Sequence, residues 1–126
     1  MAEYFFDSDV LIWCLRGQEE SVSFFRQAIQ ECLPACSSLS VIEIELGMRK
    51  GEETQTRSLM DSLQVVSVTK EIARQAAEYI RYYSSKGRQI DFVDAVIAAT
   101  CAQKRFSLVT YNLKHYPMSD FTKNSP

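Results

Sequence analysis

The sequence predicts an α/β domain with a mostly parallel central sheet flanked by helices. Short β-rich segments alternate with one or more helical segments along the chain, which is the pattern of parallel strands joined by crossover helices. The chain has 126 residues, of which 46% are hydrophobic and 24% are charged. This size and composition suit one globular core, and no repeat or linker divides the chain. We therefore expect residues 1–126 to form a single domain.

The first half of the chain is expected to contain strands and helices in alternation. A short buried strand is predicted over residues 3–7, followed by a helix that Ser8 or Asp9 caps and Gly17 ends. Apolar residues at spacings of three and four predict a second helix over about 19–32. The next expected elements are an extended segment at 34–36, a helix capped by Ser38 or Ser40 that ends near Gly51, a helix over 52–63 and a strand at 64–68.

The second half of the chain contains the helix expected at the centre of the fold. Thr69 is expected to cap a long helix that is broken at Gly87. Residues 91–105 predict a further helix, and its segment 95–100 is nearly apolar all round, so this helix is expected to be buried. A last strand is predicted at 107–110, and the tail beyond it carries only weak signals.

Charge and composition narrow the classes of function. A net charge of −2 and a pI of about 5.4 give no general basic surface for binding nucleic acid. They do not exclude a nuclease, because carboxylates that hold divalent cations also make a chain acidic. Neither a long apolar run nor a signal peptide is evident, so we expect a cytoplasmic protein without a membrane partner. The four scattered cysteines suit that compartment and do not form a zinc set.

Polar residues follow the ends of several predicted strands. In open parallel sheets the functional crevice lies at the carboxyl ends of the strands. The residues expected there are Asp7 after the first strand, Glu43 in the first turn of the helix after the second, Asp91 and Asp94 at the start of the apolar helix, and Thr110 and Asn112 after the last strand. Gathered carboxylates repel one another unless a positive charge compensates, and a hard divalent cation takes oxygen ligands. One or two such ions could activate water and stabilise charge on a phosphodiester.

Each acidic residue also has a simpler explanation. Asp7 and Asp91 could cap the helices that follow them, and Glu43 could interact favourably with a helix dipole. Asp94 fits such a role least well, because it stands against the apolar run from Ala95, where an unpaired charge would be costly. A shared metal site accounts for all four residues together.

Four segments, in order along the chain, resemble the motifs of PIN domains. Residues 5–12 are similar to the first motif, commonly Leu-Asp-Thr-Asn followed by aliphatic residues, and residues 40–49 are similar to the second. Residues 94–100 closely resemble the third motif, Asp-Ala-x-Ile-Ala-Ala, and residues 108–116 resemble the fourth. The resemblance spans residues 5–116 and is to VapC-like toxin ribonucleases of VapBC toxin–antitoxin systems in particular.

This resemblance implies an endoribonuclease that depends on Mg²⁺ or Mn²⁺, acts on RNA, forms a homodimer and is neutralised by a cognate antitoxin. Asp7, Glu43 and Asp94 would hold the metal and, with Asn112, would make up the catalytic set. The residues expected to support them are Asp9, Asp91 and Thr110, and those expected to grip the RNA backbone are Arg49, Lys50, Lys86 and Arg88.

Two positions depart from the family pattern. Asn112 stands where Asp is common, which lowers the charge of the site, and Asp9 replaces the more usual Asn. The last edge strand is also expected to be poorly formed, because the segment after the fourth motif is short and polar.

Aromatic side chains exceed what a chain of this size readily buries. Part of this surface is expected to form a two-fold dimer face and part to accept an antitoxin segment. The residues concerned are Trp13, Phe24, Phe25, Tyr79, Tyr82 and Tyr83.

Other classes of protein remain as alternatives. A catalytically inactive PIN-like module that binds RNA or a protein is the main one, although all three acidic positions are filled. A flavodoxin-like or receiver-like domain is disfavoured because no Gly-rich phosphate loop follows a strand. Nucleophilic hydrolysis has little support, because the only histidine, His115, has no obvious acid–base partner and no G-x-S-x-G motif is present.

Overall fold

The computed structural model describes residues 3–126 and places a parallel sheet at the centre of the molecule. The sheet has five strands in the order β3-β2-β1-β4-β5, and every neighbouring pair is parallel. The strands are β1 Tyr4–Phe6, β2 Ala35–Ser37, β3 Gln64–Val66, β4 Ser107–Val109 and β5 Lys123–Asn124. The predicted α/β class is confirmed, with a sheet that is parallel throughout.

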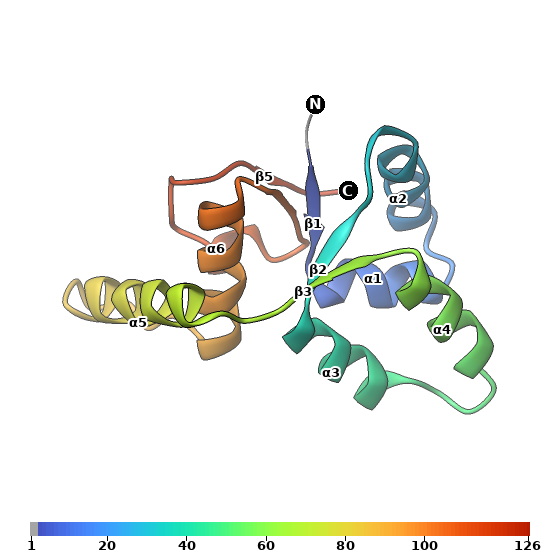
Figure 1. The fold of residues 1–126 in the computed structure, drawn as a ribbon, viewed down its shortest axis with the longest axis horizontal. Coiled ribbons are helices and arrows are strands. Elements are labelled where there is room, and N and C mark those ends of the chain that lie inside the picture. Colours follow the sequence, from blue (N-terminus) through green and yellow to red (C-terminus); the bar gives the residue numbers. More distant parts are fainter. Residues whose placement is uncertain (1–2) are drawn as a thin grey trace.

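Helices cover both faces of this sheet. Helices α5 and α6 lie together on one side, and α1 to α4 lie on the other (Figure 1). The helices are α1 Ser8–Leu15, α2 Glu19–Glu31, α3 Ser38–Gly47, α4 Glu53–Asp61, α5 Lys70–Ser84 and α6 Phe92–Lys104. Within residues 3–126, none of them is both long enough and apolar enough to cross a membrane.

Successive residues of the central strand β1 pack into two separate hydrophobic clusters, one on each face of the sheet. Phe5 packs in the cluster formed with α5 and α6, whereas Phe6 packs in the cluster formed with α1 to α4. This alternation follows from the two-residue period of a strand, and burial on both faces explains why β1 is almost wholly apolar. The predicted central position of α6 is confirmed, because its residues 95–101 are all buried.

The first helix begins one residue earlier than predicted. Its N-cap is Asp7, whose carboxylate accepts a hydrogen bond from the backbone N–H of Ser8 at 2.9 Å. Ser8 or Asp9 was the expected cap, and both lie inside the helix instead, whereas the capping role considered as the simpler explanation for Asp7 is confirmed. The strand ends at Phe6, so the first residue able to cap is already the acidic one.

The third helix is shifted in the same direction. Ser37 caps it by accepting from the N–H of Leu39 at 3.1 Å, in place of Ser38 or Ser40. The helix therefore starts at Ser38 and ends at Gly47, well before Gly51, and Glu43 lies in its second turn rather than the first. The predicted start was wrong because the Ser37 hydroxyl, at the end of β2, already accepts a hydrogen bond from one of the free N–H groups of the first turn.

The remaining caps agree with the sequence analysis. The Thr69 hydroxyl accepts from the N–H of Ile72, and the Asp91 carboxylate accepts from the N–H of Val93. Gly87 follows α5 with a φ of +79°, a left-handed conformation that favours glycine.

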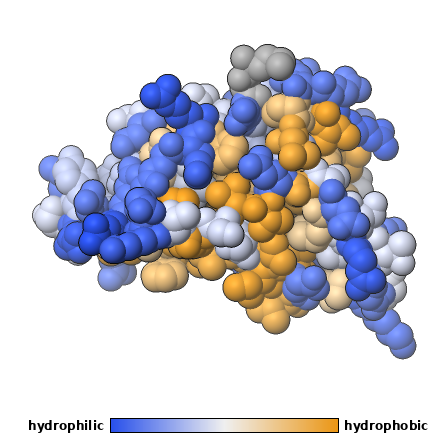
Figure 2. Space-filling model, in the orientation of Figure 1, coloured by the Kyte–Doolittle hydropathy of each residue, from blue (hydrophilic) through white to orange (hydrophobic). Residues whose placement is uncertain are grey.

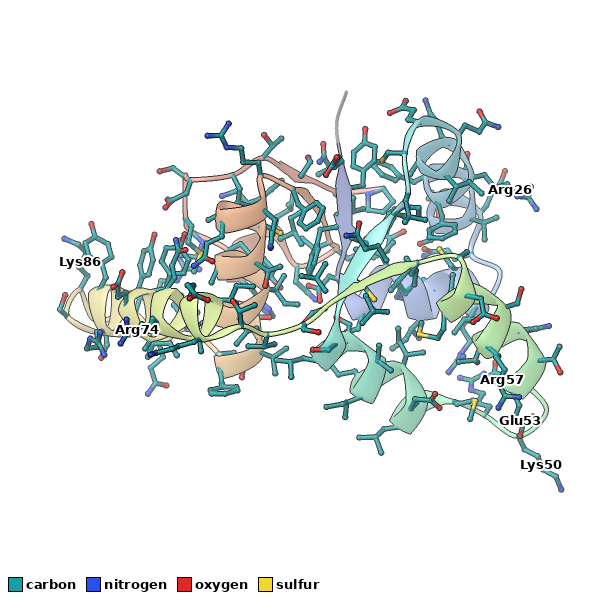
Figure 3. All side chains as sticks on the ribbon, in the orientation of Figure 1. Arg26, Lys50, Glu53, Arg57, Arg74 and Lys86 are labelled. Carbon is teal, nitrogen blue, oxygen red and sulfur yellow. The ribbon has the colours of Figure 1, made fainter. Side chains whose placement is uncertain are left out.

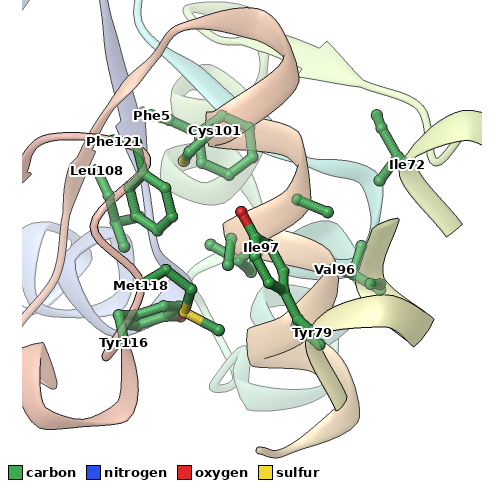
Figure 4. Close-up of a cluster of buried hydrophobic side chains, with 14 of the residues drawn as sticks. Phe5, Ile72, Tyr79, Val96, Ile97, Cys101, Leu108, Tyr116, Met118 and Phe121 are labelled. Atoms are coloured by element: carbon green, nitrogen blue, oxygen red, sulfur yellow. The ribbon is translucent and has the colours of Figure 1, made fainter. Parts of the chain in front are cut away.

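The tail contributes more to the core than its sequence suggested. After the short 3-10 helix Leu113–His115, the chain buries Tyr116, Met118 and Phe121 against the cluster that contains Ile97 of α6 (Figure 4). The final strand is only two residues long, as expected for a poorly formed edge. The tail signals were weak because irregular segments bury side chains without any periodic pattern.

Truncation of a tail side chain should therefore destabilise the whole domain. Met118 is fully buried, so Met118→Ala should lower the free energy of unfolding by about 2–5 kcal/mol in urea denaturation. The matched control is Leu113→Ala, at a 41% exposed side chain in the same segment, which should cost less than about 1 kcal/mol. Equal stability of the two variants would mean that the tail does not belong to the core.

Candidate functional site

Neighbouring strands bring Asp7 and Thr110 together at the carboxyl edge of the sheet. Asp7 follows β1 and Thr110 follows β4, and the Thr110 hydroxyl donates to Asp7 Oδ2 at 3.0 Å. The other oxygen of Asp7 accepts the Ser8 N–H at the start of α1. Asp7 is only 7% exposed, so these bonds hold a nearly buried carboxylate in one orientation.

A tyrosine hydroxyl joins Asp7 to Asp94. The hydroxyl oxygen of Tyr116 lies 2.8 Å from Asp7 Oδ2 and 3.1 Å from Asp94 Oδ1. Burial, together with the charges of the two carboxylates, raises the pKa of Tyr116 far above its ordinary value, so the group keeps its proton. Since a phenol carries one O–H, the two carboxylates share a single donor.

Tyr116 was not among the predicted site residues. Its contacts lie 109 and 22 residues away in the sequence, so no local pattern shows them. The available signal was the aromatic residue that closes the fourth motif.

Asp94 has a second partner in His115. The Nδ1 atom of His115 lies 3.2 Å from Asp94 Oδ2, and the imidazole is about half exposed. The expectation that His115 lacks an acidic partner was therefore wrong, because the 3-10 helix after β4 carries the imidazole to the start of α6. Burial raises the pKa of Asp94, and the nearby charge of Asp7 adds to this effect, whereas Tyr116 and His115 oppose it.

Asp9 lies on the same edge and faces the segment that follows β4. Its Oδ2 accepts from the backbone N–H of Tyr111 and from the Nδ2 of Asn112, each at 3.0 Å. Its Oδ1 accepts from the N–H of Val10 at 2.7 Å. Burial, with a further contribution from Asp7, raises the pKa of Asp9 to about 6. The amide of Asn112 thus contacts Asp9, which the sequence analysis did not anticipate.

Glu43 reaches the site through a serine. Its exposed side chain extends from the second turn of α3, and its Oε1 accepts from the Ser8 hydroxyl at 2.9 Å. Ser8 directly follows Asp7, so the structure brings Glu43 to the neighbourhood of Asp7 without direct contact. Asp91 serves as the cap of α6, the simpler of the two roles considered for it.

A small cavity opens beside Asp94 and His115. It has a volume of about 190 Å³. Its walls also include Lys114 and Arg88, and the Arg88 guanidinium donates to the backbone carbonyl of Lys114. The remaining lining residues are Gln89, Ile90 and Asp91. Two cationic residues, Arg88 and Lys114, therefore line a cavity next to the acidic site.

The four cationic residues predicted to bind the RNA backbone do not form one continuous surface. Arg88 lines the cavity, but Lys50 and Lys86 lie at opposite ends of the long axis of the molecule (Figure 3). Arg49 precedes Lys50 in the turn between α3 and α4, where its backbone N–H donates to Glu52. Lys86 stands over the ring of Tyr82, 5.0 Å from its centroid.

The donor chemistry of the site fits a hard divalent cation. Among residues 3–126, the ion pairs are Arg16–Glu52 and His115–Asp94, so no Lys or Arg neutralises Asp7 or Asp94. In the same part of the chain, no three His, Cys, Asp or Glu side chains lie close enough to hold one ion together. Mg²⁺ commonly uses one or two carboxylates and fills its other positions with water. The pair Asp7 and Asp94 meets that requirement.

Comparison with known proteins identifies the family and the fold. Residues 4–119 match the PIN domain family. The chain is 35% identical over 117 residues to Ribonuclease VapC10 of Mycobacterium tuberculosis, covering 93% of this chain and 88% of the relative. It is 31% identical over 113 residues to Ribonuclease VapC19 of the same organism, covering 89% and 90%. The fold matches DNA-bound VapBC from Salmonella typhimurium with a TM-score of 0.84, at 17% identity, over 99% of this chain and 98% of that one.

The hydroxyl of Tyr116 should stabilise the metal-free protein. In EDTA, Tyr116→Phe should lower the free energy of unfolding by about 1–3 kcal/mol, because the buried Asp7 and the partly buried Asp94 lose their shared donor. The exposed Tyr82→Phe is the matched control and should behave as wild type. Urea denaturation measures both. If Tyr116→Phe were as stable as Tyr82→Phe in EDTA, the hydrogen bonds of the Tyr116 hydroxyl would not contribute to stability.

Proposed function

The chain belongs to the PIN domain family, and we propose that it is a toxin endoribonuclease of the VapC type that requires Mg²⁺ or Mn²⁺. The ribonuclease assignment follows from relatives that are 31–35% identical over most of both chains. The observation that carries the metal requirement is the pair Asp7 and Asp94, held together by one hydroxyl at the edge of a parallel sheet.

The proposed chemistry is hydrolysis of an RNA phosphodiester. A divalent cation bound at this edge would lower the pKa of a water molecule and neutralise charge on the phosphodiester. Asp7 keeps its orientation through Ser8 and Thr110, and Asp94 keeps its own through Tyr116 and His115. Because these groups are fixed before RNA arrives, the site needs little rearrangement during the reaction. Glu43, with its exposed carboxylate, is proposed as the third acidic group.

The cavity beside Asp94 suits the RNA backbone. Arg88 and Lys114 line it, and cationic side chains bind phosphate through charge without reading the base. Arg49, Lys50 and Lys86 are proposed as more distant backbone contacts, since Lys50 and Lys86 lie at the two ends of the molecule.

An antitoxin protein is the proposed partner, because the structural relatives include VapBC complexes. A groove of about 660 Å³ runs along α1 and α2 and includes Cys14, Val22 and Arg26 among its walls. Trp13, 46% exposed on α1, adds apolar surface on the same helix pair. Glu19 also lines this groove, and its mixture of apolar and charged surface suits an amphipathic segment. Cytoplasm is the proposed compartment.

A homodimer is also proposed, through a face that the aromatic count did not identify. Of the aromatic residues counted in the sequence, Tyr79 is buried, whereas Trp13 and Tyr82 are 46% and 55% exposed and lie outside α3. Hydrophobic residues gather over α3 in the lower centre of the molecule (Figure 2). Ile42, Leu46 and Phe92 are 55%, 82% and 68% exposed, and Val68 and Phe92 border an apolar cavity of about 190 Å³. A second copy of the chain would cover this surface by two-fold symmetry.

RNA cleavage by the purified protein tests the proposed function. A mixed RNA pool should be cut with Mg²⁺ or Mn²⁺ and should stay intact in EDTA. Asp94→Asn keeps the shape of the side chain but removes its charge, so the rate should fall at least roughly a hundredfold. Asp61→Asn, the same change at an exposed position of α4, should cut as wild type.

Two outcomes would contradict this proposal. Cleavage that continues in EDTA, or at the wild-type rate in Asp94→Asn, would remove the metal mechanism. A protein that cuts no RNA with either cation would instead favour the inactive binding module.

The dimer is tested by placing a charge on the exposed face of α3. Leu46→Glu should shift the protein from dimer to monomer in sedimentation velocity at micromolar concentration, because a buried unpaired carboxylate opposes association. Leu33→Glu, at a 59% exposed leucine outside α3, is the matched control and should remain dimeric. A wild-type protein that stays monomeric across the same concentrations would contradict the proposal.

A further inference from the structure

A closed triangle of hydrogen bonds ties the start of α2 to the turn that follows β4. The Tyr111 hydroxyl donates to Gln18 Oε1 at 2.6 Å and lies 2.5 Å from the Ser21 hydroxyl. The Ser21 hydroxyl itself donates to Gln18 Oε1 at 2.6 Å, and Ser21 is fully buried, so water does not compete for it. Tyr111 is therefore anchored to two residues that precede it by 93 and 90 positions in the sequence.

The polar groups of this triangle serve Tyr111 rather than the helix. Gln18 stands at the N-cap position of α2, but its side chain makes no capping hydrogen bond. The ring of Tyr111 already packs against the hydrophobic cluster that contains Phe6 and Val109, so a phenylalanine would fill the same space. Apolar packing has no preferred direction, whereas a hydrogen bond weakens steeply when its geometry departs from linear. The hydroxyl of Tyr111 thus fixes a position that packing alone would leave loosely defined.

The turn that Tyr111 anchors also holds carboxylates of the site. The Thr110 hydroxyl donates to Asp7 Oδ2 at 3.0 Å, and the backbone N–H of Asn112 donates to that same hydroxyl at 3.0 Å. The backbone N–H of Tyr111 donates to Asp9 Oδ2 at 3.0 Å. On its other side the turn has only the two-residue strand β5 beside it. The position of the turn, and with it the orientation of Asp7, therefore depends on how firmly Tyr111 is held.

We infer that Tyr111 is a positioning residue for the proposed reaction, because its hydroxyl fixes the turn from which Thr110 orients Asp7. This inference rests on the proposed metal-dependent function. Displacement of a reacting group by about 1 Å can slow a reaction roughly a hundredfold. Loss of the hydroxyl should therefore slow the chemical step. It should leave RNA binding unchanged, since the cationic residues proposed to bind the RNA backbone are not part of the triangle.

Steady-state cleavage of one labelled RNA oligonucleotide that wild type cuts, at saturating Mn²⁺, tests this inference. Tyr111→Phe should lower kcat roughly tenfold and leave KM within about twofold, the scale for losing a group that supports a metal ligand. Gln18→Leu should lower kcat less, because the Ser21 hydroxyl still contacts Tyr111. The double variant should lose no more than Tyr111→Phe alone, since both changes break the same contact. Tyr4→Phe removes the hydroxyl of another partly buried tyrosine packed on the same cluster and should cut as wild type.

Thermal unfolding in EDTA separates positioning from a structural role. Tyr111→Phe leaves the Ser21 hydroxyl bonded to Gln18, so no buried donor is unpaired and the melting temperature should stay within about 5 °C of wild type. A loss of activity that comes with a larger fall in melting temperature would assign the hydroxyl a structural role and overturn the inference. A wild-type kcat in Tyr111→Phe, a change confined to KM, or losses that add in the double variant would overturn it as well. If wild type cut no RNA, the proposed function itself would fail, which is a distinct result.

Discussion

One hydroxyl proton shared by two carboxylates connects most parts of this molecule. Tyr116 donates between Asp7 and Asp94, which come from the end of β1 and the start of α6. Three segments must meet for this contact to form: the central strand, the buried helix and the tail that returns from β4. The tail reaches the site because Tyr116, Met118 and Phe121 are themselves buried in the core. Packing and site geometry therefore depend on each other.

The carboxylates gathered at the carboxyl edge of the sheet lower the electrostatic stability of the metal-free protein. Backbone N–H groups and hydroxyls hold Asp7 and Asp9, but they carry no full positive charge. Burial raises the pKa of Asp9 and of Asp94, which is the expected response of partly buried carboxylates that no Lys or Arg neutralises. A bound divalent cation would remove this cost, so binding should stabilise the folded protein. Because no Lys or Arg of residues 3–126 pairs with these carboxylates, they are free to bind a metal.

The sequence predicted those features that depend on local pattern. Strand ends with acidic residues, the apolar helix α6 and the caps Thr69 and Asp91 could all be read from neighbouring residues. The contacts of Tyr116, His115 and Asn112 could not, because each joins segments that are distant in sequence. Two helix starts were misplaced, since Ser37 both ends β2 and caps α3, and Asp7 caps α1 directly after β1 ends at Phe6. The apolar face over α3 was missed because exposure depends on how the helices pack.

The proposed function depends on a divalent cation held by Asp7 and Asp94 at the carboxyl edge of the sheet. The most direct measurement is anomalous diffraction from crystals of this protein soaked in Mn²⁺. We expect an anomalous peak about 2 Å from an oxygen of each of these two carboxylates. A peak elsewhere, or none at a Mn²⁺ concentration that supports RNA cleavage in solution, would contradict it.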